Sequence, residues 1–192
     1  MLLACARHIV TATCKVRNGK WPKKELKGIE LYGKTIGIIG CGRVGKEVAK
    51  RAEAFGMRVM IYDPYKKEKY PNLPLNELLR QADIITLHVP LTEETLGMIG
   101  EKEFNMMKKG VIFINTSRGP VVDERALIKA LRSGKIYAAG LDVFSSEPPN
   151  NKELLSSPNL VLTPHIGANT YEAQRKISID VAKIILDFCK RL

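Results

Sequence analysis

The sequence predicts an α/β protein with a doubly wound parallel sheet of about six strands and helices on both faces. Three observations lead to this prediction. Short, almost wholly apolar runs alternate with amphipathic helical runs, which is typical of a parallel sheet covered on both sides. A glycine-rich loop follows the first apolar run, and polar residues with reactive side chains follow the later ones. The length of 192 residues suits one domain with its own core.

The chain begins with a predicted amphipathic helix. Residues from Leu2 to Thr13 keep helical spacing, and Asn18-Gly19 is a typical helix end. No capping residue precedes Leu2, so we expect the chain to open inside a helix, with a preceding segment missing. Residues 21–31 are polar and irregular, which indicates an arm or linker.

Each later element follows from its local pattern. Apolar runs rich in β-branched residues predict strands, and runs with apolar residues on one helical face, often ended by glycine, predict helices. The predicted strands are 36–39, 59–62, 84–89, 111–114, 138–142 and 160–162. The predicted helices are 44–55, 75–82, 101–107, 123–133 and 170–188. Asn169 and Glu172 have the spacing of a capping box for the last helix.

The formal net charge of +11 would suit an anionic ligand, so a nucleic-acid surface has to be considered. The basic residues are scattered in pairs without interleaved aromatics, which favours solvated lysine-rich helix faces and no nucleic-acid partner. No apolar run approaches the roughly 20 residues of a membrane-spanning helix, so no membrane partner is expected. The four cysteines form no CxxC pair, which predicts no metal site. Isolated thiols without a secretory signal indicate the cytoplasm.

The glycine-rich loop has the spacing of a dinucleotide-binding fingerprint, which predicts a Rossmann-type sheet. Gly40, Gly42 and Gly45 fit the pattern G-x-G-x-x-G between a strand and a helix, and Asp63 follows Gly42 at about the required 20 residues. Gly40 permits the turn, Gly42 leaves room for a pyrophosphate, and Gly45 lets helix and strand approach. The helix N-terminus attracts phosphates. Asp63 would bind ribose hydroxyls and repel a 2′-phosphate, which favours NAD over NADP.

Two alternatives to this interpretation stay open. Residues 40–46 also fit the opening of a Walker A loop, but Glu47 stands where the magnesium-binding serine or threonine should be, and its carboxylate would repel phosphates. The glycines could also serve a plain turn between strand and helix, without any ligand.

Arg118, Glu147 and His165 are the candidate catalytic residues. Each follows a different predicted strand, on the edge of the sheet where ligands bind in open α/β proteins. An imidazole can exchange the proton of a hydroxyl, a neighbouring carboxylate raises its pKa, and a guanidinium binds a carboxylate at two points. Taken alone, His165 could cap a helix, Glu147 could be an exposed loop glutamate, and Arg118 could be a surface arginine. His88 is expected inside an apolar strand, with a structural role.

These motifs, together with 33–40, 115–123, 141–149 and 165–174, make the chain resemble the D-2-hydroxyacid dehydrogenases over essentially its whole length. The segment 165–174 is most similar to the phosphoglycerate branch of that family. The resemblance implies that Arg118 anchors the substrate carboxylate and that His165, supported by Glu147, is the acid/base. It also implies that NAD contacts Gly40, Gly42, Arg43, Val44, Gly45, Asp63, Val89, Pro90, Thr116, Ser117, Arg118, Asp142, His165, Gly167 and Ala168.

Within this resemblance, residues 1–192 correspond to a cofactor domain, and the substrate-binding domain that family members build from chain on both sides is not recognisable. The resemblance implies oxidation of a 2-hydroxy acid such as 3-phospho-D-glycerate, and pairing of two copies through the cofactor domain. Three alternatives stay open. These are a glyoxylate or hydroxypyruvate reductase, a non-catalytic NAD-sensing corepressor of the same fold, and a nucleic-acid binder suggested by charge alone.

Overall fold

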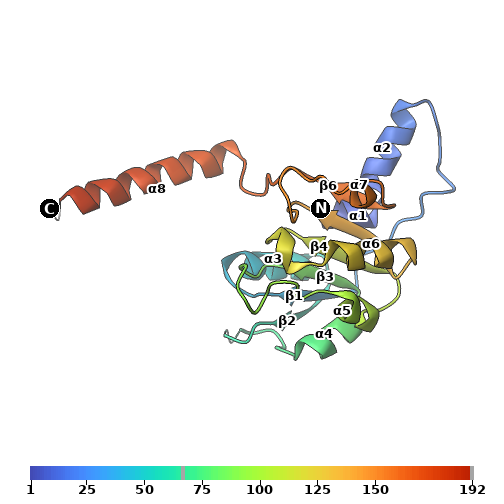
Figure 1. The fold of residues 1–192 in the computed structure, drawn as a ribbon, viewed down its shortest axis with the longest axis horizontal. Coiled ribbons are helices and arrows are strands. Elements are labelled where there is room, and N and C mark those ends of the chain that lie inside the picture. Colours follow the sequence, from blue (N-terminus) through green and yellow to red (C-terminus); the bar gives the residue numbers. More distant parts are fainter. Residues whose placement is uncertain (66–67, 191–192) are drawn as a thin grey trace.

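The computed structural model describes residues 1–65 and 68–190 and contains one six-stranded sheet (Figure 1). The strand order is β2-β1-β3-β4-β5-β6, and every neighbouring pair is parallel, which confirms the predicted doubly wound sheet. The order reverses at β1, because β2 lies on one side of it and β3 on the other. The strands are β1 Thr35–Ile39, β2 Arg58–Tyr62, β3 Ile84–Leu87, β4 Val111–Asn115, β5 Ile136–Leu141 and β6 Leu160–Leu162.

Helices cover the two faces of the sheet, and a 3-10 helix, η1, spans Gly119–Val121. The α-helices are α1 Leu2–Ala6, α2 Ile9–Arg17, α3 Arg43–Ala54, α4 Leu75–Gln81, α5 Glu101–Met106, α6 Glu124–Arg132, α7 Lys152–Leu155 and α8 Tyr171–Cys189. Most lie close to the predicted ranges and differ at the ends, where assignments usually vary. The short elements η1 and α7 were not predicted.

The alternation of side chains along each strand builds two separate hydrophobic layers. Ile39 packs in the layer formed with α4, α5 and α6, whereas Ile36 and Ile38 pack in the layer formed with α1 and α3. Every residue of β1, β3 and β4 is buried, and these strands are apolar except for Thr35, Thr86 and Asn115. Burial of each large aliphatic side chain contributes about 1.5–3 kcal/mol, so the central strands dominate the stability of the sheet.

The single helix predicted at the N-terminus is wrong, because the structure has two. His8 lies between α1 and α2 in the left-handed conformation, with φ of 52°. Cys5 and Ala6 in α1 are buried against the sheet, whereas α2 has no buried residue and projects from the body (Figure 1). The ring of His8 contacts the Tyr137 hydroxyl and the carbonyl of Lys27, and these contacts fix the bend.

Two other local predictions are corrected. The strand β3 ends at Leu87, where its neighbours β1 and β4 also end, so His88 lies in the following loop. The cap of α8 is Thr170, whose hydroxyl accepts a hydrogen bond from the Ala173 amide, rather than Asn169.

The helix α8 extends away from the sheet, as the red ribbon of Figure 1 shows. None of its residues is buried, and Ile184, Ile185 and Phe188 are among its exposed apolar side chains. In the part of the chain that the structure describes, no helix is long and apolar enough to cross a membrane.

Replacement of a central strand residue tests this layered core. Ile38 is 0% exposed and Ile184 in α8 is 69% exposed, so the same Ile→Ala change can be compared in both environments. We expect Ile38→Ala to lower the free energy of unfolding by about 2–5 kcal/mol, because it leaves a cavity, and Ile184→Ala to change it by less than about 0.5 kcal/mol. Urea denaturation measures both. Equal losses would contradict the assignment of Ile38 to the core.

Candidate functional site

One row of paired residues crosses all six strands at their carboxyl ends. The row consists of Tyr62, Ile39, Leu87, Asn115, Leu141 and Leu162. The next residue of each strand therefore begins a loop at the same edge of the sheet, and these residues are Asp63, Gly40, His88, Thr116, Asp142 and Thr163. This edge carries the predicted site residues, and it is the edge at which open α/β sheets bind ligands.

The glycine loop forms the close strand–helix junction that the fingerprint requires. A Cβ atom on Gly45 would lie 2.2 Å from the Gly40 carbonyl oxygen, so a larger residue would push α3 away from β1. Beside Gly42, the N-cap of α3, a Cβ would meet nothing within 4 Å. Gly42 supplies no side-chain cap to the first turn of α3. Open space and uncapped amide groups at a helix N-terminus fit a pyrophosphate, and therefore the expected dinucleotide.

Asp63 ties the glycine loop to the loop that follows β2. Its side chain is buried, Oδ2 accepts a hydrogen bond from the Cys41 amide at 2.8 Å, and Oδ1 accepts one from the Tyr65 amide at 3.0 Å. The carboxylate is thus held beside the turn at Gly42, at the position expected for a ribose-binding acid.

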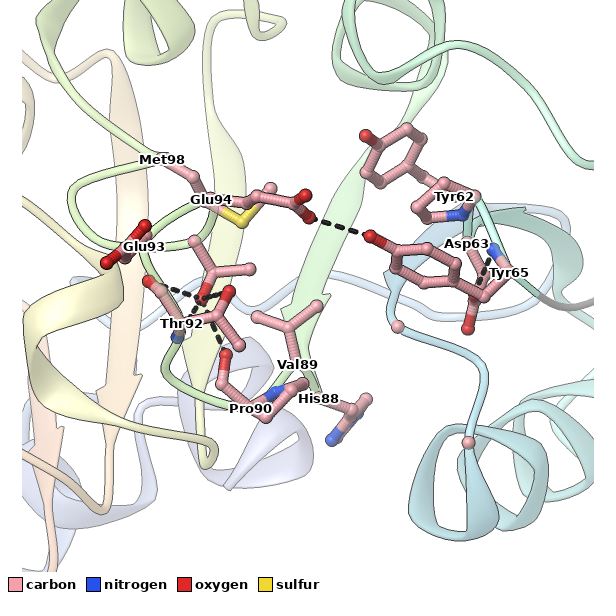
Figure 2. Close-up of a pocket in the computed structure, with 14 residues that line it drawn as sticks. Tyr62, Asp63, Tyr65, His88, Val89, Pro90, Thr92, Glu93, Glu94 and Met98 are labelled. Carbon is pink, nitrogen blue, oxygen red and sulfur yellow. Dashed lines mark hydrogen bonds between the residues drawn. The ribbon is translucent and has the colours of Figure 1, made fainter.

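A cavity of about 640 Å³ lies between the loops that follow β1, β2 and β3 (Figure 2). This volume is within the usual range for small-molecule sites. The lining residues are Gly40, Gly42, Tyr62, Asp63, Pro64, Tyr65, His88, Val89, Pro90, Thr92, Glu93, Glu94, Thr95 and Met98. Five of the predicted cofactor-binding residues line this cavity, namely Gly40, Gly42, Asp63, Val89 and Pro90. The contribution of residues 92–98 was missed, since no motif marks this loop.

His88 lines this cavity, so the expectation that it lies within a strand is wrong. Its Nε2 is 3.0 Å from the hydroxyl of Thr86, and its amide donates to the Ile39 carbonyl. Burial lowers the pKa of His88 to about 4, so the ring is neutral at physiological pH. The apolar run 84–89 obscured this position, because it continues beyond the last paired residue of β3.

Glu147 and His165 lie in contact, although they come from the loops after β5 and β6. The Nδ1 atom of His165 is 2.8 Å from Oε2 of Glu147, whose Oε1 accepts a hydrogen bond from the Phe144 amide at 3.2 Å. The hydrogen bond from His165 holds the pKa of Glu147 below its ordinary value. Because Nδ1 is engaged, Nε2 is the ring nitrogen that can exchange a proton with a ligand.

Asp142 holds the loop that carries His165. This carboxylate is 4% exposed and accepts hydrogen bonds from the Thr163 hydroxyl and from the amides of Ile166 and Gly167, the last two at 2.9 Å. His165 has a φ of 54°, a left-handed conformation that is uncommon for histidine. The residues that donate the three hydrogen bonds to Asp142 lie on both sides of His165 in the sequence, so these bonds stabilise the turn.

Arg118 lies at the same edge, on the loop after β4. Its Nη1 donates to the Ser117 carbonyl at 2.7 Å, and the side chain of Asn115 bridges the turn by hydrogen bonds to Ser117 and to the Arg118 carbonyl. A Cβ on Gly119 would lie 1.9 Å from the Phe144 backbone, so this glycine lets the loop pack against the one that holds Glu147. Within the described residues, no hydrogen bond joins Arg118 to the pair formed by Glu147 and His165.

The other predicted cofactor residues line the rest of this edge. Arg43 and Val44 are exposed in the first turn of α3, Ser117 is buried, and Thr116 is partly buried. Gly167 and Ala168 are exposed, next to His165. In the described part of the chain, no group of three or more histidine, cysteine, aspartate or glutamate side chains could hold a metal ion.

Comparison with known proteins identifies the family. Residues 1–167 match the family described as D-isomer specific 2-hydroxyacid dehydrogenase, NAD binding domain. The chain is 53% identical over 193 residues to a hydroxypyruvate reductase of Thermotoga maritima, with 96% of this chain and 62% of that protein covered. It is 50% identical over 192 residues to a D-3-phosphoglycerate dehydrogenase of Methanocaldococcus jannaschii, with 96% of this chain and 37% of that protein covered.

Among solved structures, the chain is similar to a D-lactate dehydrogenase of Aquifex aeolicus complexed with NAD and lactic acid. The two are 34% identical with a TM-score of 0.90, and the match covers 98% of this chain and 63% of that one. The chain therefore spans between about two fifths and two thirds of the length of these three proteins.

The contact between Glu147 and His165 makes a testable pH prediction. The folded-state pKa of Glu147 is depressed, so the stabilisation from this contact is complete above the unfolded-state pKa and is lost as the pH falls through the folded-state pKa. We expect NMR titration to give a Glu147 pKa below the ordinary value for glutamate, and His165→Ala to raise this pKa, while the hydrogen bond from the Phe144 amide still lowers it. An unchanged Glu147 pKa in the variant would show that His165 is not the cause.

Proposed function

We propose that the site of this chain serves hydride transfer between NAD and a D-2-hydroxy acid. The chain belongs to the D-isomer specific 2-hydroxyacid dehydrogenases, and it matches the NAD-binding domain of that family. The observation that carries the proposal is the hydrogen bond between His165 and Glu147, at the same sheet edge as the glycine loop. An acid/base with a supporting carboxylate next to a dinucleotide site is what the oxidation of an alcohol requires.

In this proposal each residue has a defined chemical role. Arg118 binds the substrate carboxylate through its guanidinium. His165 takes the proton of the substrate hydroxyl at Nε2, and Glu147 stabilises the protonated ring through Nδ1. When bound, NAD supplies the acceptor for the hydride that leaves the substrate carbon. In the reverse direction His165 returns the proton to the carbonyl oxygen.

The cofactor would be held by the groups that surround the glycine loop. The amides at the start of α3, with Arg43 and Val44, would bind the pyrophosphate, and Asp63 would bind the adenosine ribose. The family resemblance adds contacts from Val89, Pro90, Thr116, Ser117, Gly167 and Ala168, and a hydrogen bond from the nicotinamide carboxamide to Asp142.

For the substrate, we propose 3-phospho-D-glycerate, which would be oxidised to 3-phosphohydroxypyruvate in serine biosynthesis. Support comes from the segment 165–174, which resembles the phosphoglycerate branch, and from the 50% identity to the dehydrogenase of Methanocaldococcus jannaschii. The second candidate is hydroxypyruvate or glyoxylate reduction, which the 53% identity to the Thermotoga maritima reductase favours.

We further propose that the active protein contains a separate substrate-binding domain, that two copies pair through the cofactor domain, and that the protein acts in the cytoplasm. The exposed apolar side chains of α8 support packing against such a domain. The exposed α2 and Trp21, which is 81% exposed, support an intersubunit contact near residues 21–31. The described cysteines are free thiols, which fits a reducing compartment.

Cofactor binding can be measured on this chain by calorimetry. We expect NAD to bind with Kd in the micromolar-to-millimolar range, and the chain alone to show little turnover. Asp63→Asn should weaken NAD binding by about tenfold or more, because a charged acceptor for the ribose hydroxyls is lost, and should narrow the preference for NAD over NADP. Asp187→Asn in the exposed helix α8 is the matched control. Absence of NAD binding to the folded wild-type chain would overturn the proposal.

Substrate and acid/base can be tested together in the enzyme that contains this domain. Among phosphohydroxypyruvate, hydroxypyruvate and glyoxylate, we expect phosphohydroxypyruvate to give the highest kcat/KM, measured by NADH consumption. His165→Gln should lower kcat by about 10²–10⁴-fold with each substrate, since proton transfer is removed. A higher kcat/KM for hydroxypyruvate or glyoxylate would favour the second candidate, and full activity of His165→Gln would exclude the proposed acid/base.

A further inference from the structure

Two side chains meet across the mouth of the cavity, and neither belongs to the dinucleotide fingerprint. The Tyr65 hydroxyl donates a hydrogen bond to Oε2 of Glu94 at 2.7 Å. Tyr65 comes from the loop after β2 and Glu94 from the loop after β3, and Figure 2 shows the bond spanning the space between these loops. The two side chains therefore connect opposite walls of the same cavity.

At one end of the contact between Tyr65 and Glu94, the backbone of Tyr65 is fixed through Asp63. The Tyr65 amide donates to Oδ1 of Asp63, and the Asn72 side chain makes hydrogen bonds to both the amide and the carbonyl of Asp63, at 3.1 and 2.8 Å. A displacement of Tyr65 would therefore be transmitted to the carboxylate that we assign to the ribose. Glu94 also raises the pKa of the Tyr65 hydroxyl, so this group stays protonated and able to donate.

The glutamate end lies on an equally constrained turn. The Thr95 hydroxyl donates to the Pro90 carbonyl at 2.6 Å, and the amide of Thr92 donates to the Thr95 hydroxyl oxygen at 2.8 Å. The amide of Leu96 closes the turn on the Thr92 carbonyl at 2.9 Å. These bonds hold the turn against Pro90, so the backbone of Glu94 is fixed at the cavity mouth.

The cavity between the two ends has the chemistry of a purine site. Val89, Pro90, Met98 and the ring of Tyr62 offer apolar surface to the faces of a flat base. One carboxylate oxygen of Glu94 accepts from Tyr65, and the other is an acceptor for an exocyclic amino group. A carboxylate cannot donate to a carbonyl oxygen, so the site would favour a 6-amino purine over a 6-oxo purine.

We propose that Tyr65 and Glu94 form a strap that closes the cavity over the adenine of the dinucleotide and selects the amino group of that base. The proposal rests on the proposed function, since it assigns this cavity to the adenosine half of NAD. Neither residue contacts the reacting atoms, so their role is in binding and specificity.

Calorimetry on the 192-residue chain tests the strap with three probes: NAD, nicotinamide hypoxanthine dinucleotide and nicotinamide mononucleotide. Tyr65→Phe and Glu94→Gln should each raise the Kd for NAD by about three- to tenfold, and the double variant should be no weaker than the weaker single variant. Hypoxanthine dinucleotide should bind the wild type about tenfold more weakly than NAD, and Glu94→Gln should narrow this ratio, because an amide can donate to a 6-oxo group. Mononucleotide affinity should be unchanged.

Matched controls separate the strap from general effects. Tyr32 is 76% exposed, as Tyr65 is, and Tyr32→Phe should have no effect. Glu77 is exposed in α4 and does not line the cavity, and Glu77→Gln should leave NAD affinity unchanged. The strap would be overturned if Tyr65→Phe left NAD affinity unchanged or if the losses of the two single variants added up in the double variant. It would also be overturned if the variants weakened mononucleotide binding as much as NAD binding, or if the wild type bound both dinucleotides equally well. If wild-type chain binds no NAD, the proposed function fails, and the comparison of AMP with IMP decides on the strap alone.

Discussion

The site depends on one constraint, the parallel register that carries a single row of paired residues across six strands. Because the row passes through Ile39, Leu87, Asn115 and Leu141, the chain leaves every strand at the same edge and at the same level. Loops that are far apart in the sequence therefore begin side by side. The buried aliphatic side chains that hold this register do no chemistry, but a shift in one strand would displace every functional group on its loop.

At this edge, carboxylates hold the loops in place by accepting backbone amides. Asp63 accepts the amides of Cys41 and Tyr65, and Asp142 accepts those of Ile166 and Gly167. A buried carboxylate is costly unless it is hydrogen-bonded, so each of these groups has one stable arrangement of the surrounding backbone. The same residues that we assign to ligand contacts thus also define the shape of the site, and substitution at either position would affect both.

The sequence predicted the parts of this molecule that depend on local patterns. The strands followed from apolar runs, and the glycine loop from spacing and from an acid at the end of the next strand. Predictions failed where a distant contact decides the local structure. The bend at His8 depends on Tyr137 in β5, the end of β3 at Leu87 depends on its neighbouring strands, and the contact between Tyr65 and Glu94 joins two loops without a shared motif.

The contact between Glu147 and His165 is only partly protected from water, since their side chains are 40% and 49% exposed. In such surroundings solvent screens the interaction, whereas hydride transfer benefits from a site that excludes water. The helix α8 begins at Tyr171, and the few residues between it and His165 can span at most about 20 Å. A surface that covers the first turn of α8 would therefore also lie near His165, whereas Ile184, Ile185 and Phe188 lie more than about three turns further along the helix. Covering the start of the helix and shielding the contact between Glu147 and His165 would, on this geometry, be two consequences of the same packing event.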